Sequence, residues 1–129
     1  SACIDAVLKV KSNMDSGMFY GIQKGAIAAL QSAASWFDEM NAIYAKRRIL
    51  TEALAEKLGC EVYKEGVGLF VWAKLPAGIT SAEDFIDKIL YEKYIFITPG
   101  TIFGSNGEGY IRFALCVKEE KIEEAIRRF

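Results

Sequence analysis

Apolar residues recur at helical spacing through the first half of the chain. Residues 2–11 and 19–32 carry apolar side chains three and four positions apart, which predicts two helices. Asp15 or Ser16 is placed to cap the second of them. Residues 35–58 predict the longest helix, roughly 24 residues, opened by a capping box at Ser35 and Asp38. Its apolar face is formed by Trp36, Met40, Ile43, Leu50, Leu54 and Leu58.

Strand-like patterns follow in the second half. Residues 61–64 predict a short strand, and residues 69–75 a longer one that is almost continuously apolar. Such a run is typical of a strand covered on both faces, and we expect both faces of this one to be buried. Residues 94–97 predict a third strand, which ends at the turn formers Thr98-Pro99-Gly100. Residues 109–116 predict the fourth.

Two shorter helices complete the pattern. Thr80 and Glu83 form a second predicted capping box, which opens a helix with apolar positions as far as Leu90. Residues 118–129 predict a final amphipathic helix. The order of helices and strands predicts an α/β fold of the two-layer α+β type, in which helices cover one face of a small mixed or antiparallel sheet.

The fourth predicted strand contains one charge, Arg112. Alternation puts Arg112 on one face with Tyr110, Ala114 and Cys116, whereas the opposite face is purely apolar. A guanidinium in apolar surroundings needs an anionic partner, and its planar fork fits a carboxylate. From the pattern alone, a substrate carboxylate and a carboxylate of the same domain are equally good partners.

Composition excludes several kinds of chemistry. The chain has 129 residues and a net charge of −1, which predicts one globular domain without a nucleic-acid or membrane surface. It has no histidine, so the Ser-His-Asp, Cys-His and His-ligated metal sites are excluded, and we expect no metal ligand. Three widely spaced cysteines argue against a disulfide framework and favour a reducing cytoplasm. We expect Cys60 and Cys116 to be small core residues.

Two further stretches invite a functional interpretation. The pattern G-x-x-G-x-G at residues 104–109 leads into a strand, whereas phosphate-binding loops open a helix, so we expect a flexible connection near a binding cleft. The basic cluster at residues 46–48 lies on the long predicted helix. We expect it to be a solvated helix face with carboxylate neighbours.

Four stretches, in this order, resemble the fold-type-I pyridoxal-phosphate aminotransferases. The first is KVKSNMDSGMF at residues 9–19, followed by Ile22-Gln23. The other three are GVGLFVW at 66–72, ITPGTIFG at 97–104 and GEGYIRF at 107–113. The resemblance covers essentially the whole chain and is closest to the class I/II branch of aspartate-like and LL-diaminopimelate-like enzymes.

The resemblance implies roles for particular residues. In this family the arginine of the last stretch, here Arg112, binds the α-carboxylate of the amino-acid or 2-oxo-acid substrate. Asn13, in a segment near the domain junction, is a weaker substrate-binding candidate. Residues 1–32 correspond to interdomain helices at the end of the large domain, and residues 33–129 to the C-terminal small domain. The family also implies the cofactor pyridoxal 5'-phosphate and a cytoplasmic homodimer.

The chain departs from the family in lacking the cofactor-binding residues. No lysine here has the Ser-x-x-Lys context of the Schiff-base lysine, which we expect upstream together with the large domain. We therefore expect that the chain alone neither binds pyridoxal phosphate tightly nor transaminates, and that apolar surface is exposed around Val7, Met18, Phe19 and Ile22. The alternative is a freestanding α/β binding or oligomerisation module without catalysis, which a reading frame starting at residue 1 would favour.

Overall fold

A computed structural model of the chain describes residues 1–14 and 17–129. Asp15 and Ser16, the predicted cap residues of the second helix, lie outside the described residues. The chain divides into two compact units, Ser1–Asp38 and Glu39–Phe129, which we describe separately.

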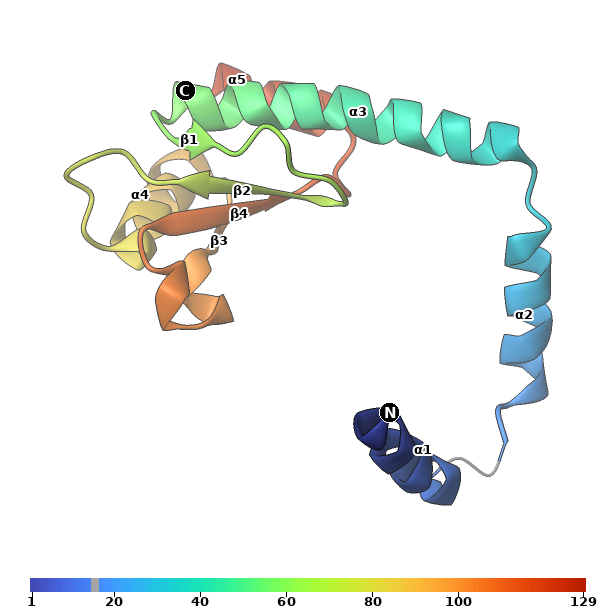
Figure 1. Cartoon of the computed structure of the whole chain (residues 1–129). Coiled ribbons are helices and arrows are strands. Elements are labelled where there is room, and N and C mark those ends of the chain that lie inside the picture. Colours follow the sequence, from blue (N-terminus) through green and yellow to red (C-terminus); the bar gives the residue numbers. More distant parts are fainter. Residues whose placement is uncertain (15–16) are drawn as a thin grey trace. The chain divides into compact units, whose positions relative to one another are not determined.

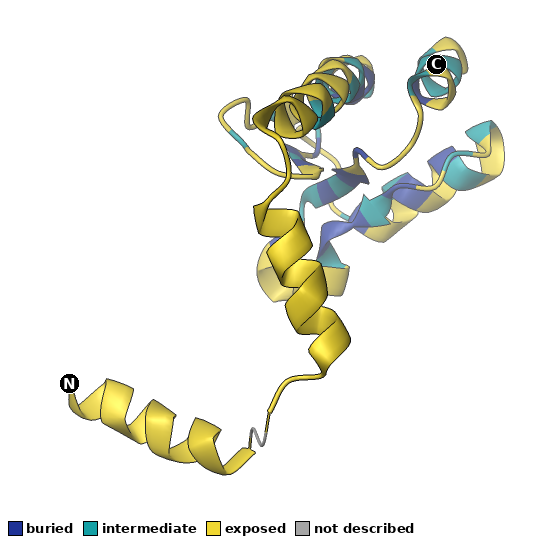
Figure 2. Cartoon of the chain, turned by 90° about the vertical axis from the view of Figure 1, so that its right-hand side faces the viewer, coloured by how far each residue is buried: buried dark blue, intermediate teal, exposed yellow. Residues whose placement is uncertain are grey.

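The first unit is mainly helical, and none of its described residues, 1–14 and 17–38, is buried. Helix α1 (Ala2–Met14) and helix α2 (Tyr20–Leu30) both form where the periodicity predicts helices, and neither contains a buried residue (Figure 2). The apolar side chains that we expected on the surface are exposed in the structure, namely Val7, Met18, Phe19 and Ile22.

Helix α3 (Ala34–Lys57) is the longest element, with 24 residues, as the sequence predicts. Its buried residues, Thr51, Leu54 and Ala55, all lie near its C-terminal end, and Trp36 at the other end is exposed. The predicted capping box at Ser35 is wrong, because the helix begins one residue earlier and Ser35 lies inside its first turn. At the other end, Gly59 adopts the left-handed conformation that terminates many helices (φ 76°).

A four-stranded antiparallel sheet forms the centre of the second unit, as Figure 1 shows. Its strands lie in the order β1-β2-β4-β3. Their bounds are β1 Glu61–Val62, β2 Phe70–Lys74, β3 Thr98–Pro99 and β4 Tyr110–Ala114. Strand β4 is central and pairs with β2 on one side and β3 on the other.

Helices cover one face of this sheet. Core residues of β2 and β4 pack with residues from α3, α4 (Ala82–Lys93) and α5 (Glu119–Arg127). The central members of this core are Leu54, Val71, Ala73, Ile86, Ile89, Ile111, Phe113 and Leu115. The fold is therefore the expected two-layer α/β arrangement with helices on one face of the sheet.

The opposite face of the sheet is open, and this corrects one prediction. Burial along β2 alternates, with Val71 and Ala73 buried and Phe70 and Lys74 exposed. A continuously apolar run therefore does not mean two covered faces here, because Phe70 and Trp72 lie on the side away from the core.

Two other predictions are wrong in position. The cap of α4 is Ser81 rather than Thr80, since the Ser81 hydroxyl accepts the Asp84 N–H at 3.1 Å. The third strand comprises only Thr98 and Pro99, because Tyr94 ends α4 in the left-handed conformation and the chain pairs with β4 only later.

The cysteines divide between core and surface. Cys60 is buried, as expected, and burial raises the pKa of its thiol to about 11. Cys116 is exposed, so its assignment to the core is wrong. It lies in the turn that follows β4, beyond the paired part of the strand.

The basic cluster of α3 links the helix to the sheet. The Arg47 Nε donates to Glu119 Oε1 at 2.8 Å, and its Nη1 donates to the Leu115 carbonyl at 3.2 Å. Arg48 donates to the carbonyls of Gly68 and Phe70 at 2.9 and 3.3 Å. The expectation of carboxylate neighbours is confirmed, but the face is not simply solvated, because these two arginines bind the ends of β2 and β4.

The Arg47–Glu119 pair makes stability depend on pH. The backbone N–H of Glu119 and then the Arg47 guanidinium lower the pKa of the Glu119 carboxyl from its ordinary 4.5. The carboxylate therefore contributes fully to the free energy of unfolding at pH values above its ordinary pKa. This contribution is lost as the pH falls through the lower pKa of the folded state. We expect Glu119→Gln to lower the stability of the protein near neutral pH.

Chemical unfolding at a series of pH values measures this effect. The difference between the wild-type protein and Glu119→Gln should shrink as the pH falls below 4.5. Glu120→Gln, on an exposed position of the same helical turn, is the matched control. A difference that stays constant at all pH values would contradict the assignment.

Candidate functional site

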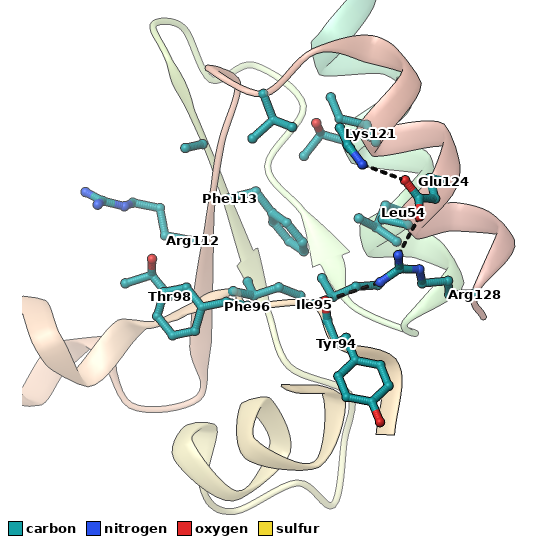
Figure 3. A pocket seen from close by; sticks show the side chains of 16 residues that line it. Leu54, Tyr94, Ile95, Phe96, Thr98, Arg112, Phe113, Lys121, Glu124 and Arg128 are labelled. Carbon is teal, nitrogen blue, oxygen red and sulfur yellow. Dashed lines mark hydrogen bonds and ion pairs between the residues drawn. The ribbon is translucent and has the colours of Figure 1, made fainter. Parts of the chain in front are cut away.

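Arg112 lies at the middle of the central strand. Within β4 it is opposite Trp72 of β2 and Thr98 of β3. Figure 3 shows Arg112 and Phe113 pointing to opposite sides of the strand, with Phe113 directed toward the helices. Arg112 is half-buried and belongs to the open face of the sheet.

Two phenyl rings pack against the Arg112 guanidinium. Its Cζ lies over the ring of Phe70 at 4.1 Å and over the ring of Phe103 at 4.0 Å from the ring centroids. Phe70 comes from β2, whereas Phe103 ends the 3-10 helix η1 (Gly100–Phe103) that follows β3. Aromatic faces attract cations, and the flat guanidinium stacks on them well.

The aromatic surface continues beyond these two rings. Trp72 meets Phe103 edge-on with ring centroids 5.9 Å apart, and it stacks on Tyr110 at 5.6 Å. The alternation of β2 and β4 could have placed Phe70, Trp72 and Tyr110 beside Arg112 in advance. Phe103 has no such signal in the sequence, because it reaches the sheet face from a turn.

The hydrogen-bonding edge of Arg112 is not used within the described part of the chain. Across residues 1–14 and 17–129, no oxygen accepts a hydrogen bond from its guanidinium and no carboxylate pairs with it. The other arginines of this region, Arg47 and Arg48, do have such oxygen partners. The alternative of an internal salt bridge therefore finds no support among the described residues, and the edge is available to an external anion.

The turn that carries Phe103 is tightly built. A methyl group added to Gly100 would lie 2.1 Å from the carbonyl oxygen of Gly107, and one added to Gly107 would lie 1.9 Å from that of Gly100. Residues 104–109 include the helix η2 (Ser105–Gly107), which lies in main-chain contact with η1, and the flexibility expected of this connection stays a prediction.

Side chains tie the same turn to helix α4. The Thr101 hydroxyl donates to Glu83, and this hydrogen bond lowers the pKa of the Glu83 carboxyl. The Glu108 carboxylate accepts the N–H of Ala82 at 3.1 Å and that of Gly109 at 3.2 Å. Both ends of the turn are thus bound to the first residues of α4.

Asn13, the weaker candidate, belongs to the first unit. Its carboxamide donates to the Lys9 carbonyl at 2.6 Å, within helix α1. The structure therefore describes Asn13 and Arg112 in separate units, and a substrate role for Asn13 stays a prediction.

A pocket of about 430 Å³ lies on the helix side of the sheet, at its β3 edge (Figure 3). Phe113 points into it, whereas the Arg112 side chain points away from it. At its rim, Lys121 and Arg128 both pair with Glu124, and their hydrogen bonds lower the pKa of that carboxyl. Lys121 and Arg128 are thus already paired. Arg112 also lines this pocket, but its guanidinium points toward the other side of β4 (Figure 3).

The comparisons with known proteins agree on one family. The whole chain, residues 1–129, matches the family model described as aminotransferase class I and II. The LL-diaminopimelate aminotransferase of Oleidesulfovibrio alaskensis is 43% identical over 120 residues, which is 93% of this chain and 31% of that protein. The enzyme of the same name from Halothermothrix orenii is 42% identical over 129 residues, or 99% of this chain and 33% of that protein.

Solved structures give the same result. The substrate-bound BacF structure from Bacillus subtilis is 34% identical, with a TM-score of 0.77 over 97% of this chain and 32% of that one. The aminotransferase from Staphylococcus aureus is 32% identical, with a TM-score of 0.78 over 97% of this chain and 33% of that one. The chain belongs to the class I and II aminotransferases, and it spans about a third of the length of the relatives it matches.

This family uses pyridoxal phosphate, but the residues of this chain do not fit that cofactor by themselves. A lysine that forms a Schiff base needs an enclosed site, and every lysine here is exposed except the half-buried Lys93. The backbone N–H groups of Gly104, Gly107 and Glu108 donate to carbonyls of their own turn rather than toward an open phosphate site. We therefore assign the cofactor to no residue of this chain.

The crossing of Gly100 and Gly107 predicts a sharp effect of Gly100→Ala. The new methyl group meets backbone oxygens, which cannot rotate away, so we expect a loss of about 1–3 kcal/mol in the free energy of unfolding. Denaturant unfolding measures the loss. Asn106→Ala, an exposed position in the same turn, adds no atom to the crossing and should have little effect. Equal stability of both variants would contradict the tight crossing.

Proposed function

We propose that this chain is the C-terminal domain of a longer aminotransferase and that Arg112 binds the α-carboxylate of its substrate. The longer protein would move an amino group between an amino acid and a 2-oxo acid, with pyridoxal phosphate bound by residues outside this chain. The observation that carries the proposal is the unused edge of Arg112 on the open sheet face, in a chain that belongs to this family.

The chemistry of Arg112 suits a carboxylate. A guanidinium binds a carboxylate through two parallel N–H···O bonds, which fix the ligand in direction as well as in position. Holding the α-carboxylate in this way would orient the Cα of the substrate for reaction. Arg112 thus binds and orients, and the bonds that change are handled elsewhere in the longer protein.

We also propose the wider setting of this enzyme. The large domain would precede residues 1–32 and pack with the small domain, residues 33–129, and two copies would form a cytoplasmic homodimer. Relatives named LL-diaminopimelate aminotransferase support a role in amino-acid biosynthesis. Among the described residues, no helix is both long and apolar enough to cross a membrane.

Removal of Arg112 tests the carboxylate assignment. In the longer protein, Arg112→Ala should raise KM and lower kcat/KM. The fall in kcat/KM should correspond to a loss of about 2–5 kcal/mol in transition-state stabilisation, because truncating one partner of a shielded charge pair leaves the other charge unpaired. Arg112→Lys should recover only part of this loss, since lysine lacks the planar fork.

Steady-state kinetics with several amino acids provide the measurement. The loss should be similar for all of them, because every amino acid has the α-carboxylate. Arg127→Ala, at an exposed position at the end of α5, is the matched control and should change neither constant. Unchanged kinetics of Arg112→Ala would rule out the assignment.

We further expect the 129-residue chain alone to be inactive. Adding pyridoxal phosphate at a concentration close to that of the protein should produce no saturable visible absorption band, since no enclosed lysine is available. Spectrophotometric titration checks this, and the longer protein is the positive control. A saturable band with the short chain would show that the cofactor site lies within it.

A further inference from the structure

We infer that Phe70 and Phe103 are positioning residues, which hold the Arg112 guanidinium in one plane so that only its edge can meet a carboxylate. This inference rests on the proposed function of Arg112. It assigns a role to two residues that do not themselves need to touch the substrate.

We place the two rings on different faces of the guanidinium, on the basis of their distances and of the directions from which they approach. The Cζ atom lies over both rings, about 4 Å from each centroid. Phe70 and Phe103 reach Arg112 from β2 and from the turn after β3, the two chain segments that flank β4.

Covering both faces has two physical consequences for binding. Rotation of the guanidinium out of its plane would break a cation–π contact on each side, so its orientation is set before a ligand arrives. Water is also kept from both faces, and a carboxylate at the edge is therefore attracted more strongly than in bulk solvent.

The rings are themselves held in place. Phe103 ends the helix η1, which is fixed by the crossing of Gly100 and Gly107. Its ring also makes an edge-on contact with the ring of Trp72. Phe70 lies in a paired strand, and its carbonyl accepts a hydrogen bond from Arg48. Such a second layer of support is what keeps a binding group within its productive geometry.

Core packing does not account for these two rings. Phe70 is 45% exposed and Phe103 is 48% exposed, and neither belongs to the hydrophobic core. A leucine at either position would keep apolar volume on the surface and would lose only the flat aromatic face. Replacement by leucine therefore separates the positioning role from folding.

A double-mutant cycle in the longer protein tests the inference. The four proteins are the wild type, Phe103→Leu, Arg112→Ala and the double variant. We expect Phe103→Leu to lower kcat/KM by about 2- to 30-fold, mainly through KM, when Arg112 is present. We expect it to have no further effect in the Arg112→Ala background, because the ring acts only through the guanidinium.

Controls separate this role from a structural one. Phe96→Leu makes the same change at an exposed ring that has no aromatic–cation contact with Arg112, and it should leave kcat/KM unchanged. Phe103→Tyr retains the aromatic face and should restore the wild-type value. The inhibition constant of acetate, with acetamide as the neutral control, repeats the cycle on binding alone.

Each outcome decides a different claim. If Phe103→Leu lowers kcat/KM equally with and without Arg112, the positioning role is overturned and the carboxylate role of Arg112 stands. If Arg112→Ala leaves kcat/KM unchanged, the proposed function itself fails. Should Phe103→Leu unfold at a lower temperature than the wild type, the same cycle with Phe70→Leu takes its place.

Discussion

Burial of a single face of the sheet is the constraint on which the rest of the second unit depends. Ile111, Phe113 and Leu115 enter the core with residues of α3, α4 and α5. Side chains alternate along a strand, so burying these three forces Arg112 to the opposite face. A shift of one residue in the pairing of β4 would place the guanidinium in the core and the apolar side chains in solvent. Core and site are therefore specified by one register.

Much of this arrangement is readable from the sequence. Periodicity predicts each helix, and alternation along residues 109–116 predicts which side of β4 carries Arg112. The approach of Phe103 is not readable, because it depends on a turn whose path is set by the contact between two glycines. The Phe70 contact lies between these cases, since alternation places the ring on the correct face but says nothing of its distance from the guanidinium.

The incorrect predictions have a common physical origin. Apolar sequence does not ensure burial at β2 or at Cys116, because Phe70 is exposed on the open face and Cys116 is exposed in the turn after β4. A residue pattern reports what a face can bury, whereas other elements determine what covers it. An open face that combines aromatic rings with an unused guanidinium edge is suited to contact with something beyond the described residues.

The crossing of Gly100 and Gly107 also limits which amino-acid substitutions this turn can accept. The atoms that obstruct a side chain at either position are main-chain oxygens and carbons, which every amino acid possesses. No substitution at the opposing position can therefore create room, and second-site suppressors of Gly100→Ala should not arise at residue 107. Genetic variation at the two glycines is independent in this sense, since each is constrained by the backbone of the other and not by its side chain.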